Sequence, residues 1–205
     1  MLLLMATALA LGMLHTVAPD HLAAVGVFVS RRPDWRDAAR HGARWGIGHS
    51  LSILLVGGVA VVSAVRIPPA LEPRLEQAVG LMLVGLGVLA WRRAAQGHPP
   101  AHAADSPSHA HDEGTLLGIG MVHGLAGSGA LVAALPAATA RSHAEAFVYL
   151  AAFGVGTVVA MAVLAVGLGA LIRSAADRAL RVQRIVVRAA ALTSMLVGGW
   201  WFAAS

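Results

Sequence analysis

Long apolar blocks dominate this sequence and limit what it can fold into. About six of them approach or exceed the roughly 20 apolar residues that an α-helix needs to cross a hydrocarbon core. Only 12% of the 205 residues are charged, about half the share found in a soluble domain. The sequence therefore predicts an all-α membrane protein with six transmembrane helices. The expected spans are Leu2–Ser30, Trp45–Val65, Leu75–Trp91, Gly114–Ala138, Ala144–Ile172 and Ile185–Ala204.

The positions of the arginines predict how the chain is oriented. The chain has no lysine, and 12 of its 15 arginines fall in three alternate loops between the expected spans. Arginine concentrates in cytoplasmic loops, so we expect a multi-pass inner (plasma) membrane protein with both termini outside the cytoplasm. The basic charge then reflects topology, and nucleic-acid binding is not expected. The twelve are Arg31, Arg32, Arg36, Arg40, Arg44, Arg92, Arg93, Arg173, Arg178, Arg181, Arg184 and Arg188; the other three are Arg66, Arg74 and Arg141.

Several kinds of chemistry are excluded by what the sequence lacks. There is no cysteine, which removes disulfides, thiolate metal sites and thiol–disulfide electron transfer. Without lysine there is no phosphate-binding GxxxxGK[ST] loop, so ATP hydrolysis by this chain is not supported. No basic segment precedes the first apolar block, and we therefore expect no cleaved signal peptide.

An internal repeat divides the chain into two halves. Gly12-Met13-Leu14-His15 recurs as Gly120-Met121-Val122-His123, at an offset of 108 residues. The same offset carries Gly46-Ile47-Gly48 onto Gly154-Val155-Gly156. Each half has three expected spans, so the second half would enter the membrane in the opposite sense, which gives two inverted three-helix repeats. We expect the repeats at residues 1–95 and 114–205, joined by a His-rich cytoplasmic linker at residues 96–113.

The strongest chemical signal is the H-x4-D-H motif His15-Thr16-Val17-Ala18-Pro19-Asp20-His21 in the first span. On an unbroken helix, His15 and His21 would point to different faces, because they are about 600° apart. Pro19 cannot donate the hydrogen bond that the His15 carbonyl would accept. We therefore expect the helix to break, so that both imidazoles and the freed carbonyl converge around Asp20. A hydrogen-bonded helix break without any ligand is the alternative.

Asp20 and the histidines are the types of residue that a hard or borderline metal ion needs. An acid inside a membrane span costs about 2.5–3.5 kcal/mol on insertion scales, and either a bound dication or a hydrogen bond donated by His21 would offset that cost. Imidazole suits nickel, cobalt, copper and zinc, whereas the absence of thiolates disfavours copper(I) and soft zinc sites. The motif therefore predicts a metal site at membrane depth.

Two further histidines are candidate ligands in other spans. His49 follows Gly46-Ile47-Gly48, whose small residues permit close helix contact, so its ring is expected to reach the first helix; a buried core histidine is the alternative. His123 occupies the repeat position of His15, and it either completes the metal site, gates the path or packs in a glycine-rich helix. Ser128 and Gly129 stand where Asp20 and His21 stand.

Other polar residues are weaker candidates. Thr157 stands at the repeat position of His49. The linker residues form either a cytoplasmic metal trap or a dispensable linker, and the second interpretation is favoured. These residues are His98, His102, Asp105, His109, His111, Asp112 and Glu113.

At these motifs the chain resembles the nickel/cobalt transporter (NiCoT) superfamily, and within it the short six-helix nickel permeases associated with urease accessory functions. The resemblance rests on the H-x4-D-H motif, on Gly48-His49-Ser50 and on His123–Gly129. It implies Ni²⁺ or Co²⁺ as transported substrate, with His15, Asp20, His21 and His49 binding the ion. Ser128 departs from the acidic residues that longer members carry in the second half.

The sequence thus predicts a secondary permease for Ni²⁺ or Co²⁺, with uptake favoured over efflux and no enzymatic activity of its own. The metal site would consist of His15, Asp20, His21, His49 and His123. Metallochaperones or urease and hydrogenase maturation proteins are the protein partners that such a role implies. A membrane metalloenzyme is the competing function, although Asp20 is the only acid available in the spans. An accessory subunit without ion flux is a further alternative.

Overall fold

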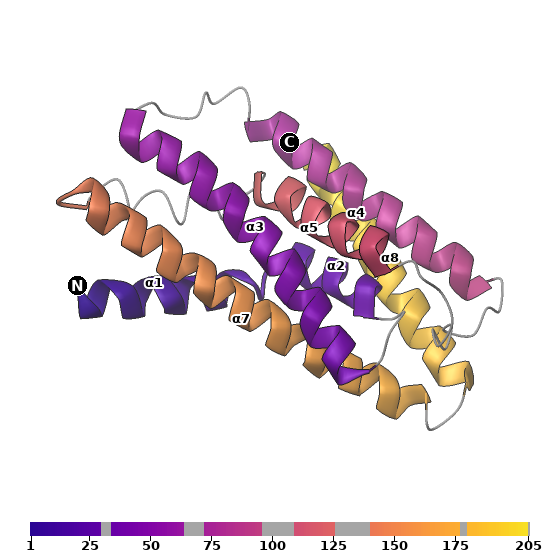
Figure 1. The fold of residues 1–205 in the computed structure, drawn as a ribbon. Coiled ribbons are helices and arrows are strands. Elements are labelled where there is room, and N and C mark those ends of the chain that lie inside the picture. Colours follow the sequence, from indigo (N-terminus) through magenta and orange to yellow (C-terminus); the bar gives the residue numbers. More distant parts are fainter. Residues whose placement is uncertain (30–33, 64–71, 96–108, 126–139, 177–179, 205) are drawn as a thin grey trace.

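The computed structural model describes residues 1–29, 34–63, 72–95, 109–125, 140–176 and 180–204. All regular structure in these ranges is helical, and no strand occurs in them. The long helices run lengthwise through the molecule (Figure 1). They are α1 (Leu2–His15), α2 (Pro19–Val29), α3 (Trp35–Ser63), α4 (Glu72–Ala95), α5 (His109–Leu125), α7 (His143–Ala176) and α8 (Leu180–Ala204).

The long helices confirm an all-α membrane protein. Three of them are long and apolar enough to cross a membrane, at Trp35–Ser63, Pro73–Arg92 and His143–Leu171. The pair α1 and α2 meets the same test as one broken span, with a bend of 65° between its two parts. The apolar part of α5, Gly114–Leu125, is shorter, and the residues that follow it in the expected span lie outside the described ranges. The count of six spans therefore stays a prediction.

The arginines expected in loops lie on helices wherever the structure describes them. Helix α3 begins ten residues before the predicted span, so that Arg36, Arg40 and Arg44 form one stripe along its first turns. Likewise Arg92 belongs to α4 and Arg188 to α8. The prediction of loops was wrong here because spacing by four residues places these charges on a single helix face, where they do not oppose helix formation. The arginine-bearing helix ends still gather at one end of the bundle, and both chain termini lie toward the other (Figure 1).

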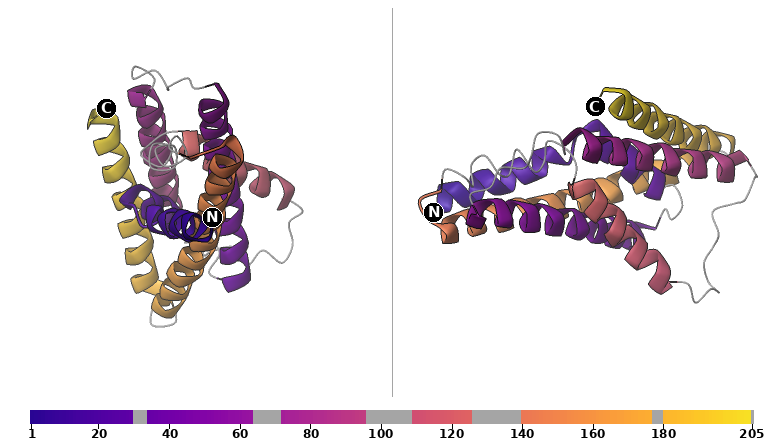
Figure 2. Two further views of the ribbon diagram at one scale, coloured as in Figure 1. Left: turned by 90° about the vertical axis from the view of Figure 1, so that its left-hand side faces the viewer. Right: turned by 90° about the horizontal axis from the view of Figure 1, so that it is seen from above.

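Two pairs of helices pack through contacts that repeat at the offset of 108 residues. Helix α1 packs on α7, and α5 packs on α3 (Figures 1 and 2). A Cβ atom at Gly12 would overlap the Phe153 carbonyl, and one at Gly120 would overlap the Trp45 carbonyl. Residues 45 and 153 are themselves 108 positions apart. Both glycines therefore permit a backbone approach that no side chain would allow.

The second glycine pair behaves in the same way. A Cβ atom at Gly48 would overlap the carbonyl of Leu117, and one at Gly156 would overlap the carbonyl of Leu9. Gly48 and Gly156 are 108 positions apart, and so are Leu9 and Leu117. The first helix of each half thus lies against the second helix of the other half, and these two crossings enclose the polar centre of the molecule.

Helices α4 and α8 form a third close pair, antiparallel along one side of the bundle (Figure 2). Small residues again set their distance, since a Cβ atom at Gly80 would lie 2.6 Å from the Gly198 carbonyl oxygen. The Ser194 hydroxyl donates a hydrogen bond of 2.8 Å to the Leu83 carbonyl. A hydrophobic core that includes Trp45 and Leu83 joins this pair to the two crossings.

Candidate metal centre

The first span breaks between His15 and Pro19, as the sequence predicts. Helix α1 ends at His15, and Thr16 supports that end by donating its hydroxyl proton to the Met13 carbonyl over 2.7 Å. Pro19 is the first residue of α2, where its missing N–H is not needed and its fixed φ favours the helix. The expectation of a free His15 carbonyl was wrong, because the Ala18 N–H donates to it over 3.2 Å.

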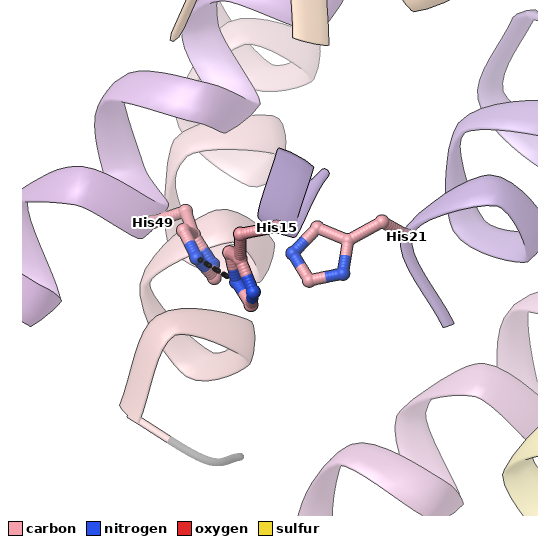
Figure 3. Close-up of side chains that lie close together, drawn as sticks. All are labelled: His15, His21 and His49. Carbon is pink, nitrogen blue, oxygen red and sulfur yellow. Dashed lines mark hydrogen bonds between the residues drawn. The ribbon is translucent and has the colours of Figure 1, made fainter. Parts of the chain in front are cut away.

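Three histidines from three helices converge at this break. Ring nitrogens of His15, His21 and His49 all lie within 4.8 Å of one another. Nε2 of His15 is 3.2 Å from Nε2 of His49, so one of these two nitrogens donates a proton and the other accepts it. Figure 3 shows His21 with one ring nitrogen facing this pair; its ring centroid lies 4.6 Å from that of His15 and 5.0 Å from that of His49. His21 and His49 are 1% exposed, whereas His15 is partly exposed.

Asp20 forms a second group with His21 and His123. Nε2 of His123 donates to Oδ2 of Asp20 over 3.0 Å, linking α5 to α2. Nδ1 of His21 lies 3.1 Å from Oδ1 of Asp20, within ion-pair distance but without the geometry of a hydrogen bond. Asp20 stands in the first turn of α2, where the positive end of the helix dipole favours a carboxylate. All three residues are buried, so the carboxylate has little contact with water.

Two aromatic rings pack against the histidines. The Trp45 ring centroid lies 5.3 Å from that of His123 and 5.9 Å from that of His21. The Phe153 ring centroid lies 5.8 Å from that of His15. Sequence reasoning missed both rings, although each stands directly before a Gly-x-Gly segment and the two are 108 positions apart. That repeat of an aromatic residue before Gly-x-Gly was the signal that would have identified them.

The arrangement fits a divalent transition-metal ion. Two nitrogen ligands at about 2.0–2.1 Å from one ion lie roughly 2.9–3.4 Å apart when they are neighbours, and about 4.2 Å apart when they are opposite. The 3.2 Å between the His15 and His49 nitrogens falls in the first range. The nitrogens of all three histidines lie within 4.8 Å of one another, so the longer distances would need to shorten only slightly to hold one ion. Buried histidine nitrogens without a hydrogen-bond partner also remain at this centre, on His21, His49 and His123. Such atoms are rare in native proteins unless a ligand or water meets them.

The remaining candidates lie elsewhere or outside the described residues. The Thr157 hydroxyl shares its one proton between the backbone carbonyls of Phe153, at 3.0 Å, and Gly12, at 3.3 Å, so it joins α7 to α1. Ser128, Gly129 and residues 96–108 of the linker lie outside the described ranges. The last part of the linker segment belongs to α5, which begins at His109.

Comparison with known proteins places the chain among membrane proteins of related sequence. It is 33% identical over 163 residues to urease accessory protein UreH from Bacillus sp. (strain TB-90), covering 74% of this chain and 69% of that protein. Two proteins of Arabidopsis thaliana also match, Chloroplast protein FOR GROWTH AND FERTILITY 2 at 28% identity and FOR GROWTH AND FERTILITY 1 at 31%. These matches cover 91% and 73% of this chain, but only 52% and 45% of the plant proteins, about half their length. No solved structure matches the chain significantly.

A family profile matches most of the chain. The family described as the cytochrome c biogenesis protein transmembrane region aligns with residues 22–200. Because this chain has no cysteine, the match shows a shared membrane domain and implies no thiol–disulfide chemistry. The chain belongs to this family of membrane domains, and it is also a homologue of urease accessory protein UreH.

Proposed function

We propose that this protein is a secondary permease that carries Ni²⁺ or Co²⁺ into the cytoplasm through an intramembrane histidine site. The observation that carries the proposal is the convergence of His15, His21 and His49, whose ring nitrogens lie within 4.8 Å of one another. His15 is the last residue of α1 and lies at the middle of the broken span, Leu2–Val29, that α1 and α2 form together. The site would therefore lie near the middle of the membrane, as in transporters built from broken helices.

The five polar residues of the centre would have two different roles. His15, His21 and His49 present nitrogens to a common point and would bind the ion directly. Asp20 contacts His21 and His123 through its two oxygens, which is the arrangement of a carboxylate that orients metal-binding histidines from the outer shell. Its negative charge lowers the cost of bringing a dication to membrane depth. His123 would hold Asp20 in place and attach α5 to the site.

The two halves would move as inverted repeats. The glycine contacts related by 108 positions support two equivalent units at residues 1–95 and 114–205, each of which places its first helix on the second helix of the other. The histidine site lies between these crossings, since His15 belongs to α1, His49 to α3 and His123 to α5. Rocking of one unit against the other would expose the site first to one side of the membrane and then to the other.

The membrane potential is sufficient to drive uptake. A potential of about 100 mV contributes about 2.3 kcal/mol per charge, or about 4.6 kcal/mol for a dication. This corresponds to accumulation of roughly a thousandfold or more, and no ATPase is required. Because the interior is negative, the potential would drive the cation inward. The gathering of arginine-bearing helix ends supports an inner-membrane orientation with both termini outside the cytoplasm (Figure 1).

The name of the bacterial relative fits this function. A urease accessory protein serves a metalloenzyme. A nickel permease, which the chain resembles at the H-x4-D-H motif, would supply metal for such an enzyme. The ion released in the cytoplasm would pass to metallochaperones or to urease and hydrogenase maturation proteins.

Ion flux into proteoliposomes tests the proposal. The purified protein is reconstituted with a nickel-sensitive dye inside, and a negative interior potential is imposed with a potassium gradient. We expect Ni²⁺ or Co²⁺ influx that depends on the potential and is abolished by His21→Ala. The matched control is His143→Ala at the start of α7, outside the centre, which is expected to transport normally. Absence of flux in the wild-type protein, or flux that survives His21→Ala, contradicts the proposal.

A further inference from the structure

A groove on the outer side of α4 and α8 stands apart from the metal centre. It has a volume of about 260 Å³ and is lined by Val88, Trp91, Arg92, Leu192 and Met195. The helices on its two sides are antiparallel, so that the last turns of α4 lie beside the first half of α8. Trp91 is 39% exposed and Leu192 47% exposed, and hence the groove opens to whatever surrounds the protein.

One end of the groove is cationic. The Arg188 guanidinium carbon lies 5.5 Å from the centroid of the Trp91 ring, a cation–π distance. Arg92 follows Trp91 on the wall of the groove, and both arginines are exposed. No acidic residue lines the groove in the described part of the chain. A guanidinium stacked on an aromatic face still has N–H groups free for a phosphate.

The apolar part of the groove lies deeper along the same helices. Met195 is seven residues beyond Arg188 on α8, about 10 Å along the axis. Val88 is four residues before Arg92 on α4, in the same direction. The polarity thus changes from two cations and an indole to aliphatic side chains within one groove. A phospholipid has the same order, with a charged phosphate group followed by an apolar acyl chain. Tryptophan is enriched at the membrane–water interface, where these two parts meet.

We propose that this groove binds an anionic phospholipid, with the phosphate between Arg92 and Arg188 and one acyl chain along Val88, Leu192 and Met195. Basic pockets between transmembrane helices on the cytoplasmic side are suited to anionic head groups. The groove is lined by the last turns of α4 and by α8, and the end of α4 and the start of α8 lie where the other arginine-bearing helix ends gather (Figure 1). The lipid would hold α4 and α8 together at the membrane surface, independently of the ion that the protein carries.

Lipid association measured by electron spin resonance tests this site. The full chain is placed in nanodiscs with spin-labelled phosphatidylglycerol or phosphatidylcholine, and the preference for the anionic lipid is determined. For Arg92→Gln and Arg188→Gln we expect a fall of about fivefold each, since each arginine near the surface contributes about 1 kcal/mol. The matched control is Arg36→Gln, because Arg36 also stacks on a tryptophan, Trp35, at 5.2 Å. That substitution is expected to leave the preference within about twofold.

The other outcomes overturn the proposal. An equal loss in Arg36→Gln would mean that general charge, and not the groove, attracts the lipid. No loss in either groove variant would remove the site. A second copy of the chain is the competing occupant, and the cysteine-free sequence permits a direct check with Leu192→Cys. Disulfide-linked dimers of that variant in nanodiscs would show that protein fills the groove, whereas monomers that retain the lipid preference support the proposal.

Discussion

The two helix crossings, α1 on α7 and α5 on α3, share their packing but differ in their chemistry. In both, a glycine meets a backbone carbonyl of an aromatic residue, and that aromatic ring lies beside a histidine: Phe153 beside His15 and Trp45 beside His123. The crossings differ at the residue that directly follows Gly-x-Gly, which is His49 in α3 and Thr157 in α7. His49 faces His15, whereas Thr157 bonds to backbone. The two crossings therefore share their packing, but only α3 brings a further histidine to His15.

The largest effect is expected from making the two crossings chemically alike. His49→Thr gives α3 the residue that α7 has, and it removes one of the three converging imidazoles. We expect the affinity for Ni²⁺ to fall at least a hundredfold, more than the tenfold to hundredfold typical of an outer-shell change. Isothermal titration of the purified protein measures this. His41→Gln, two turns earlier on α3, is the control and should bind as the wild type does; equal loss in both variants would show that α3 is merely disturbed.

A smaller effect is expected from breaking the packing that the two crossings share. Gly12→Ala and Gly120→Ala each place a Cβ atom against a backbone carbonyl, and such overpacking costs about 1–3 kcal/mol. We expect both variants to lose stability by similar amounts in chemical unfolding followed by circular dichroism. Gly118→Ala on α5 is the control, since nothing lies within 4 Å of its Cβ position. A large loss at only one of the two positions would mean that the crossings are not equivalent.

The smallest effect is expected at the residue that replaces histidine in the second crossing. Thr157→Val keeps the shape of the side chain but removes the hydroxyl that bonds to the Gly12 and Phe153 carbonyls. We expect a stability loss of about 0.5–1.5 kcal/mol and an unchanged affinity for Ni²⁺. Weakened metal binding in this variant would instead place Thr157 in the site and remove the asymmetry between the crossings.

The parts of the fold that depend on local chemistry were predictable from the sequence. Proline lacks an N–H, so the break before Pro19 follows from its position inside an apolar span, and the structure confirms it. The reach of His49 to His15 was also predicted, but the expected reason was wrong, since the glycines before His49 bring α7 and α5 close to α3 and not the first helix. The structure brings His15, Asp20, His21, His49 and His123 together, and their role as metal ligands stays a prediction.

Other features needed the tertiary structure. The early start of α3 was missed because the apolar block begins only after Arg44. A helix can extend through charged residues, however, when these residues share one face. The hydrogen bond from His123 to Asp20 joins residues 103 positions apart, and no local pattern predicts such a distance in sequence. Trp45 and Phe153 belong to opposite halves of the chain, and the crossing of the halves places Trp45 beside His123 and Phe153 beside His15.

X-ray absorption spectroscopy of the nickel-loaded protein tests the central claim most directly. The linker histidines His98, His102, His109 and His111 are first replaced by glutamine, so that nickel bound there does not contribute to the spectrum. We predict nickel bound by the three imidazoles of His15, His21 and His49, and loss of the bound metal in His21→Ala. Nickel without imidazole ligands, or a spectrum that is the same in His21→Ala, would contradict the account.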